Sequence, residues 1–216
     1  MQQNVNHQEL IDSPLRHDIG DSAAVLQRAT DPDVHLSLWR RPVNEAIVQE
    51  LAQLKASDLS NTRRATSCAS FDTDVSALLQ EQGHDPAAFQ SLRADMSQLI
   101  TIFSAVSSGR DMKFRLLTTG SDDCRRFHLD RLQWRLLCTY QGPGTEWLTD
   151  AQVDREALVR CRPNGEVLRF GQASRFETCW VGILKGDPKN IGSGQVHRSP
   201  PIADSGRVRV LFSIDC

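Results

Sequence analysis

The sequence predicts an α+β fold, with a layer of helices followed by an all-β sandwich or barrel. Two observations predict it. Apolar residues recur with helical spacing over about 42–108, and from residue 110 onward short strand-like segments alternate with Gly, Pro, Asp and Asn turns. The chain has 216 residues, of which 39% are hydrophobic and 24% charged, which is typical of a globular protein with one generous core.

The first segment, 1–32, is polar, contains Pro14 and Pro32 and lacks periodicity, so we expect a loosely attached N-terminal arm. Its first twenty residues lack the apolar core of a secretory signal. No uncharged apolar run approaches the ~20 residues that cross a bilayer. The net charge of −2 does not favour nucleic acid or a membrane surface as partner. We therefore expect a cytoplasmic protein.

The second segment, 33–109, is the predicted helical layer. From Pro42 onward the apolar spacing predicts a helix with one buried face. A short helix from Asp74 to Gln82 is expected to end at Gly83. The strongest helix has Asp85 as N-cap and one apolar stripe, which consists of Phe89, Leu92, Met96, Leu99, Phe103 and Val106. The layer either builds one wall of a pocket or forms the face of a homodimer.

The third segment, 110–216, is the predicted barrel, and it forms one compact unit with the helices. Its strand-like stretches are 114–119, 124–130, 134–140, 145–148, 166–170, 178–184, 195–199 and 207–215. Residues 1–110 hold 9 Lys and Arg against 14 Asp and Glu, whereas 111–216 hold 16 against 13. The barrel is thus relatively basic, and most of its cations are arginines, which suit fixed carboxylate or phosphate contacts.

The six cysteines do not indicate a disulfide framework or a zinc ribbon. No two of them have C-x-x-C spacing, so we interpret them as reduced thiols that mostly pack as small apolar side chains. Walker, G-x-S-x-G and H-E-x-x-H motifs are also missing from the sequence. Nucleotide hydrolysis and the common hydrolase designs therefore have no support from motifs.

The candidate metal ligands are His128, Asp130 and His197. His128 and Asp130 are two residues apart and would share one face of a strand, and His197 lies in another predicted strand. Two imidazoles and one carboxylate on one side of a cation form the facial triad typical of non-haem Fe(II) oxygenases. A fourth ligand from Cys124, on the same predicted face, would favour zinc. Each residue alone also fits an ordinary packed or surface position.

The last predicted strand places arginines opposite an apolar face. Arg207 and Arg209 share one face, and the other face consists of Val208, Val210, Phe212 and Ile214. An arginine directed into a barrel is costly unless it meets a carboxylate. A planar guanidinium is well matched to bidentate capture of a free carboxylate group. Either arginine is therefore a candidate anion ligand.

This order of elements resembles the 2-oxoglutarate/Fe(II) dioxygenase superfamily. H-x-D is followed by a Gly-containing turn, a distal His, and arginines 10 and 12 residues after it. The resemblance implies a double-stranded β-helix, which is a jelly-roll or cupin-like barrel. It also implies Fe(II) on His128, Asp130 and His197, and 2-oxoglutarate with its distal carboxylate on Arg207 or Arg209.

A more specific resemblance covers most of 110–216. The strings CRRFHLD, RLLCTYQGPGTEWL, LKGD, VHRSPP and RVLFSID look like those of a bacterial family known as domain of unknown function 1826. Some members of that family are associated with metal homeostasis, zinc in particular. Its closing strand begins at the residue that matches Arg209, which favours Arg209 over Arg207 as the co-substrate ligand.

Three further residues of the barrel are candidates for the pocket. Tyr140, the only tyrosine, either donates a hydrogen bond to a bound oxoacid or packs in the core with a satisfied hydroxyl. Glu146 and Trp147 follow the Gly-Pro-Gly turn and either line the substrate mouth or belong to a tight turn with a packed Trp.

Three functions fit these residues. The first is a non-haem Fe(II)/2-oxoglutarate-dependent dioxygenase that hydroxylates an unknown substrate. The second is a non-catalytic barrel that binds zinc at the same triad in metal homeostasis. The third is a barrel used only for protein interaction, in which the His and Asp residues have no metal.

Overall fold

A computed structural model describes residues 16–216 as one mixed α+β unit built around a large, mostly antiparallel sheet. Its strands are β1 (Arg16–Gly20), β2 (Val34–Trp39), β3 (Arg64–Thr66), β4 (Met112–Thr119), β5 (Trp134–Gln141), β6 (Glu146–Trp147), β7 (Ser174–Arg175), β8 (Val181–Lys185), β9 (His197–Arg198) and β10 (Arg209–Asp215). Its helices are η1 (Ala23–Thr30), α2 (Glu45–Leu51), α3 (Phe71–Glu81), η2 (Pro86–Phe89), α4 (Gln90–Val106), η3 (Asp150–Gln152), α5 (Arg155–Val159) and α6 (Asn164–Val167).

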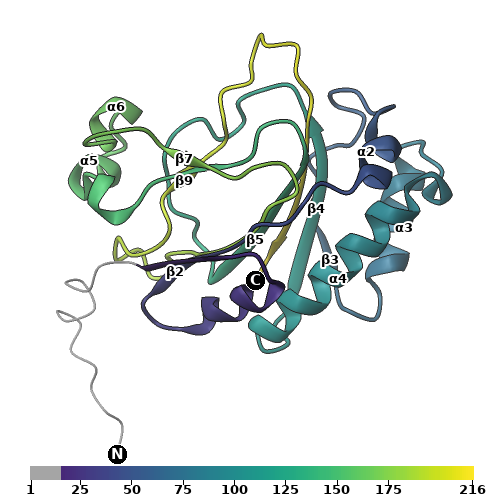
Figure 1. Ribbon diagram of the computed structural model, residues 1–216, viewed down its shortest axis with the longest axis horizontal. Coiled ribbons are helices and arrows are strands. Elements are labelled where there is room, and N and C mark those ends of the chain that lie inside the picture. The colour runs from purple at the N-terminus through teal and green to yellow at the C-terminus, as the bar shows by residue number, and fades with distance from the viewer. Residues whose placement is uncertain (1–15) are drawn as a thin grey trace, which may run out of the picture.

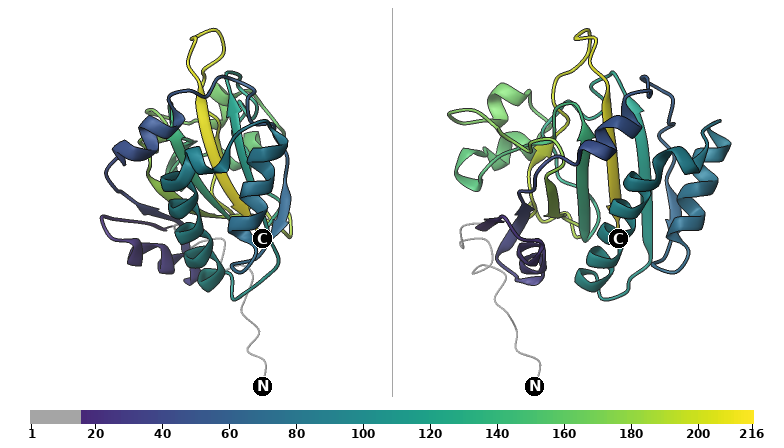
Figure 2. Two further views of the ribbon diagram at one scale, coloured as in Figure 1. Left: turned by 90° about the vertical axis from the view of Figure 1, so that its right-hand side faces the viewer. Right: turned by 45° about the vertical axis from the view of Figure 1, so that its right-hand side comes forward.

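The strands form two sheets. The large sheet has the order β1-β2-β8-β5-β10-β4-β3, and only the β1–β2 pair is parallel. The small sheet has the order β7-β6-β9. In Figure 1 the helices α2, α3 and α4 lie on one side of the large sheet, while β7, β9, α5 and α6 lie on the other. The turned view on the right of Figure 2 shows the long helix α4 running across the sheet.

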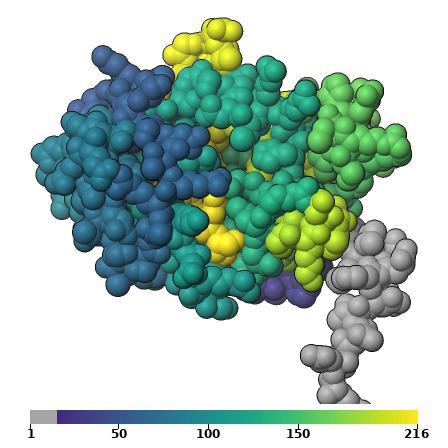
Figure 3. Space-filling model, turned by 180° about the vertical axis from the view of Figure 1, so that it is seen from behind, coloured from purple at the N-terminus to yellow at the C-terminus, as the bar shows by residue number. Residues whose placement is uncertain are grey.

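Because side chains alternate between the two faces of the large sheet, the apolar core has two parts, one on each face. On β10, Val210, Phe212 and Ile214 face the helices and are fully buried there with the apolar stripe of α4. The opposite face packs against the small sheet through a second cluster, which consists of Leu36, Leu38, Leu117, Leu137, Trp147, Phe176, Leu184 and Leu211. Seen from behind, yellow atoms of the C-terminal region lie recessed between blue and teal segments (Figure 3).

The predicted helices are found close to their expected positions. Asp85 caps the turn at Pro86, and α4 follows with the predicted stripe buried. The helix predicted from Asp74 to Gln82 begins slightly earlier, as α3. The helix expected from Pro42 begins at Glu45, because the Asn44 side chain accepts the hydrogen bond that caps it.

Residues 16–39 differ most from expectation. Part of the predicted arm, 1–15, lies outside the described residues, but 16–30 form β1 and η1 rather than loose chain. Leu26 of η1 is fully buried in the helix-side core. The segment 33–109 also supplies β2 and β3, so it is not purely helical. These strands complete the two edges of the large sheet, and their pairing depends on distant segments rather than on local periodicity.

Two predicted barrel strands are also different. The stretch 166–170 ends α6 and makes one bridge, Val153↔Leu168, because an insertion with α5 and α6 folds over the small sheet. The stretch 124–130 is a loop that pairs at one residue only. Within residues 16–216, no helix is both long and apolar enough to cross a membrane.

Candidate metal centre

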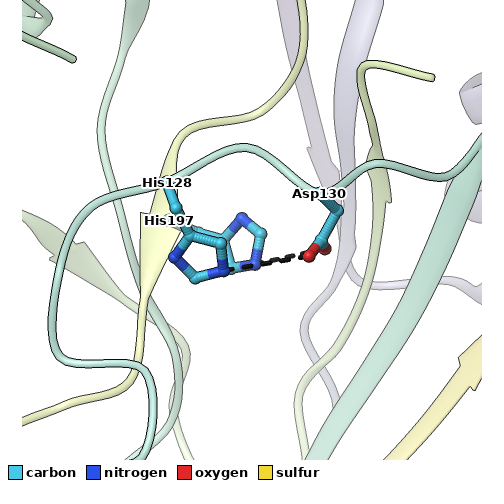
Figure 4. Close-up of side chains that lie close together, drawn as sticks. All are labelled: His128, Asp130 and His197. Atoms are coloured by element: carbon cyan, nitrogen blue, oxygen red, sulfur yellow. Dashed lines mark ion pairs between the residues drawn. The ribbon is translucent and has the colours of Figure 1, made fainter. Parts of the chain in front are cut away.

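His128 and His197 are brought together by a single antiparallel bridge. The His128 N–H donates to the His197 carbonyl at 3.0 Å, and the His197 N–H donates back at 3.2 Å. Residues opposite each other in such a pair present their side chains on one face. The two imidazole centroids are accordingly 4.5 Å apart. Figure 4 shows both rings directed toward Asp130.

Asp130 completes a compact group of three. His128 Nε2 is 3.8 Å from Asp130 Oδ1, and His197 Nε2 is 3.3 Å from Asp130 Oδ2. All three candidate ligand atoms lie within 4.8 Å of one another. The expected strand over 124–130 is not needed for this convergence, because the bridge at His128 fixes the ring and the chain turns inward two residues later.

Backbone carbonyls orient both rings. Nδ1 of His128 lies 2.9 Å from the Arg126 carbonyl, and Nδ1 of His197 lies 3.0 Å from the Gln195 carbonyl. A carbonyl only accepts, so each Nδ1 carries a proton, and in the neutral form of the ring Nε2 presents its lone pair toward Asp130. Burial lowers the pKa of His197 to about 4, so this ring is neutral at pH 7, as a metal ligand must be.

Asp130 is held from its other side by an ion-pair network. Arg135 on β5 donates to Asp130 Oδ1 at 2.6 Å and to both oxygens of Asp215 on β10 at 2.6 and 3.0 Å. Burial would raise the pKa of Asp130, but the attraction of the imidazoles when acid protonates them, and of the Arg135 guanidinium, outweighs it, so the pKa lies below its ordinary value. The carboxylate is therefore ionised at neutral pH.

One oxygen of this carboxylate lacks a partner. Asp130 Oδ2 is buried and accepts no hydrogen bond from the described residues. An orphaned anionic oxygen facing two imidazole lone pairs is costly without a cation. Two neutral imidazoles and a carboxylate are the donor set that suits Fe(II) or Zn(II). The residues thus fit a divalent transition metal.

Arg209 is a buried guanidinium near this group. It is 2% exposed, and among residues 16–216 it has no carboxylate partner. It donates to the hydroxyls of Thr139, Thr145 and Ser199 at 3.2, 2.9 and 3.4 Å, while its Nε has no partner. Burial lowers its pKa to about 10. Ser199 is two residues after His197, just past the end of β9.

Three sequence candidates lie elsewhere. Tyr140 faces the helices, where its hydroxyl donates to Asp95, and this side of β5 points away from the His residues. Arg207 is exposed in the loop before β10. Cys124 is also exposed, and the described metal group does not include it. Of the two arginines, only Arg209 is buried between the sheets.

Glu146 and Trp147, which follow the Gly-Pro-Gly turn, point to opposite faces of β6. Trp147 faces inward opposite His197 and makes an edge contact with His17, with ring centroids 4.7 Å apart. Glu146 is buried on the outer face, where it pairs with Arg175 and Arg198 on the flanking strands. The substrate-mouth interpretation therefore stays a prediction for Trp147 alone.

Sequence analysis missed Arg135 and Asp215. Both lie on the inward face of predicted strands, Arg135 one residue before the apolar run of β5 and Asp215 at the end of β10. Alternation could have placed them there, but it could not have shown that they pair with each other and with Asp130.

A comparison with protein families identifies the chain. A family model described as "Protein of unknown function (DUF1826)" matches residues 20–215. The chain belongs to the DUF1826 family. Among curated proteins, none matches this DUF1826 chain in sequence.

Solved structures share its fold. The rice dioxygenase for auxin oxidation is 15% identical and has a TM-score of 0.52, with 93% of this chain and 82% of that chain covered. Looser matches are Neurospora crassa T7H in complex with alpha-KG and thymine, which is 15% identical over 99% and 82% of the two chains at TM-score 0.39, and a Pseudomonas putida prolyl-4-hydroxylase, which is 15% identical over 82% and 94% at TM-score 0.34. The DUF1826 chain thus has the overall fold of the rice protein.

Proposed function

We propose that this DUF1826 protein is a non-haem Fe(II)- and 2-oxoglutarate-dependent dioxygenase. In the proposal His128, Asp130 and His197 hold Fe(II), and Arg209 binds the distal carboxylate of 2-oxoglutarate. Fe(II) with bound 2-oxoglutarate supplies oxidative decarboxylation coupled to hydroxylation of a substrate. The fold shared with the rice dioxygenase supports the reaction class without specifying the substrate.

The strand arrangement supports a double-stranded β-helix. If the His128 bridge is counted as a strand, each sheet contributes four strands. The large sheet supplies β4, β10, β5 and β8, and they face the four strands of the small sheet, which are the His128 segment, β9, β6 and β7. Along the chain, these segments alternate between the sheets except at β6 and β7. Such alternation is the property of a jelly-roll barrel, whose interior lies between two four-stranded sheets.

The protein residues supply position and charge. The two Nε2 atoms and Asp130 Oδ2 would hold the cation, and the cation would supply the redox chemistry that couples the co-substrate and O₂ to the substrate. Arg135 fixes the carboxylate through Oδ1. Thr139 and Thr145 accept hydrogen bonds from the Arg209 guanidinium and so orient it, and Ser199, a third acceptor, is two residues after His197.

Arg209 is the observation that carries this proposal over a zinc-handling barrel. The three metal donors suit zinc as well as iron, so they do not separate the two functions. A buried guanidinium with hydroxyl partners only, and with an unpartnered Nε, is what an organic carboxylate requires and a metal carrier does not. The anion site next to the metal group therefore favours the oxygenase.

The test is a thermal-shift titration followed by turnover. We expect 2-oxoglutarate to raise the Tm only of metal-loaded protein, and Fe(II)-loaded protein to form succinate under air. Arg209→Gln should remove both effects, while the matched control Arg207→Gln should keep both. Tight Zn(II) binding with no 2-oxoglutarate shift in either metal form would refute the oxygenase and support the zinc protein.

A further inference from the structure

A groove of about 390 Å³ adjoins the metal group at His128. His128 forms part of its wall, and its side chain is 32% exposed. The groove lies between the 126–131 loop, the helix α5 and the chain that follows β8. Its volume falls in the range of small-molecule sites. The groove thus leads from solvent to a proposed metal ligand.

The groove is lined by both apolar side chains and arginines. Phe127, Leu129 and Leu158 belong to the small apolar cluster that packs beneath α5. Arg126 and Arg131 line the same groove from exposed positions. Such a lining suits a ligand that has an apolar body and a charged group.

These two arginines differ from their neighbours in pairing. Arg160 and Arg162, on the adjacent insertion, form ion pairs with Glu156 and Glu166. Within residues 16–216, Arg126 has no carboxylate at ion-pair distance and donates only to a backbone carbonyl, that of Cys161. Arg131 likewise forms no ion pair there. Their positive charge is therefore available to a ligand.

One acidic residue, Asp187, also lines the groove. Its two oxygens accept the backbone N–H groups of Ile191 and Gly192 at 3.0 and 2.9 Å, so the carboxylate is used within its own loop. Arg126 also lines a neighbouring hollow of about 340 Å³ together with Arg125. The balance of charge at this end of the groove is positive.

We infer that the groove binds the substrate of the proposed oxygenase, and that this substrate is a small organic anion with an apolar body. The inference rests on the proposed function, because that function makes His128 a ligand of the catalytic metal. The body would lie on Phe127 and Leu158, and a carboxylate or phosphate head would meet Arg126 and Arg131. The part of the molecule that passes His128 is then presented to the metal.

Binding of three eight-carbon probes tests the groove. Octanoate, octyl phosphate and neutral octanol are titrated into Zn(II)-loaded protein and followed by ligand-observed NMR. We expect at least one anion to bind about tenfold or more tightly than octanol, with the better head group distinguishing carboxylate from phosphate. The double variant Arg126→Gln/Arg131→Gln should lose that preference. The matched control Arg160→Gln/Arg169→Gln, which removes the same charge outside the groove, should retain it.

The outcomes separate the groove from the metal chemistry. Equal affinity for octanol and both anions, or equal anion affinity in both double variants, overturns the groove assignment even if succinate forms. Arginine-dependent anion binding in a protein that neither binds Fe(II) nor responds to 2-oxoglutarate leaves the groove and removes the oxygenase. Mn(II)-loaded protein tests whether the probe binds close to the metal. The metal should broaden the NMR signals of a probe in this groove, and His197→Ala should abolish the broadening.

Discussion

The two faces of strand β10 differ in their charged residues although alternate residues of the same strand build them. On β10, Phe212 and Ile214 are fully buried against the helices. Arg209, Ser213 and Asp215 of the same strand are buried between the sheets. The first face is stabilised by apolar contacts, whereas the second holds charges that burial makes costly.

The difference shows how to find function in a buried polar surface. Most charges on the inner face are compensated, as in the Arg135–Asp215 pair. Asp130 Oδ2 and Arg209 Nε are among the ten buried side-chain atoms without a hydrogen-bond partner in the described residues, and both belong to charged groups of this inner face. Because buried charged groups normally have partners, these two are candidates for contact with a ligand.

The largest expected effect is on metal binding through the inner face. His197→Ala removes one of three donors, so Fe(II) and Zn(II) binding and any succinate formation should be lost. Calorimetric titration measures the metal, and His84→Ala, outside the site, is the control. If the variant still binds one equivalent of metal with wild-type affinity, the triad is not the site.

The helix-side face should respond in stability instead. Phe212→Ala should lower the free energy of unfolding by about 3–5 kcal/mol because it leaves a cavity in the larger core. Denaturant unfolding measures the loss, and metal affinity of the folded fraction should stay unchanged. A weaker metal site with normal stability would contradict the division between the faces.

Acid should destabilise the metal-free protein through the inner face. The pKa of His197 is about 4 in the folded state and near its ordinary value when unfolded, so the unfolded chain binds the extra proton between these values. Stability should therefore fall by about 3 kcal/mol as the pH drops from 6.5 to 4. His197→Gln should flatten this part of the pH profile measured by urea unfolding. A profile identical to that of wild type would show that the ring is not buried in its neutral form.

The smallest effect concerns Tyr140 on the helix side. Tyr140→Phe removes a hydrogen bond to Asp95, which Arg41 also holds at 2.6 and 2.8 Å, and should cost about 2 kcal/mol. The shift of Tm by 2-oxoglutarate should not change. Loss of that shift at normal stability would return Tyr140 to the co-substrate site.

Local pattern predicted one part of this molecule better than the other. The stripe of α4 and the alternation of β10 are repeated signals within one element, so the helix-side core followed from the sequence. Motif spacing made His128, Asp130 and His197 candidates for one site, and the structure brings them together, whereas the preference for Arg209 over Arg207 came from a family resemblance. The strand β1, the helix α6 and the network of Arg135 with Asp215 did not follow from the sequence, because each depends on a partner outside its own element rather than on a local pattern. For Tyr140 the structure has the second of the two interpretations, a core tyrosine whose hydroxyl donates to Asp95.

The bridge between His128 and His197 has a mechanical consequence. It is one residue long and is one of the attachments of the 121–133 loop to the segment around β9, so a cation shared by the two imidazoles would add a further link between them. Emptying the site would then loosen the segment that carries Arg126 and Arg131. Metal occupancy and access to the neighbouring groove would be governed by the same pair of rings.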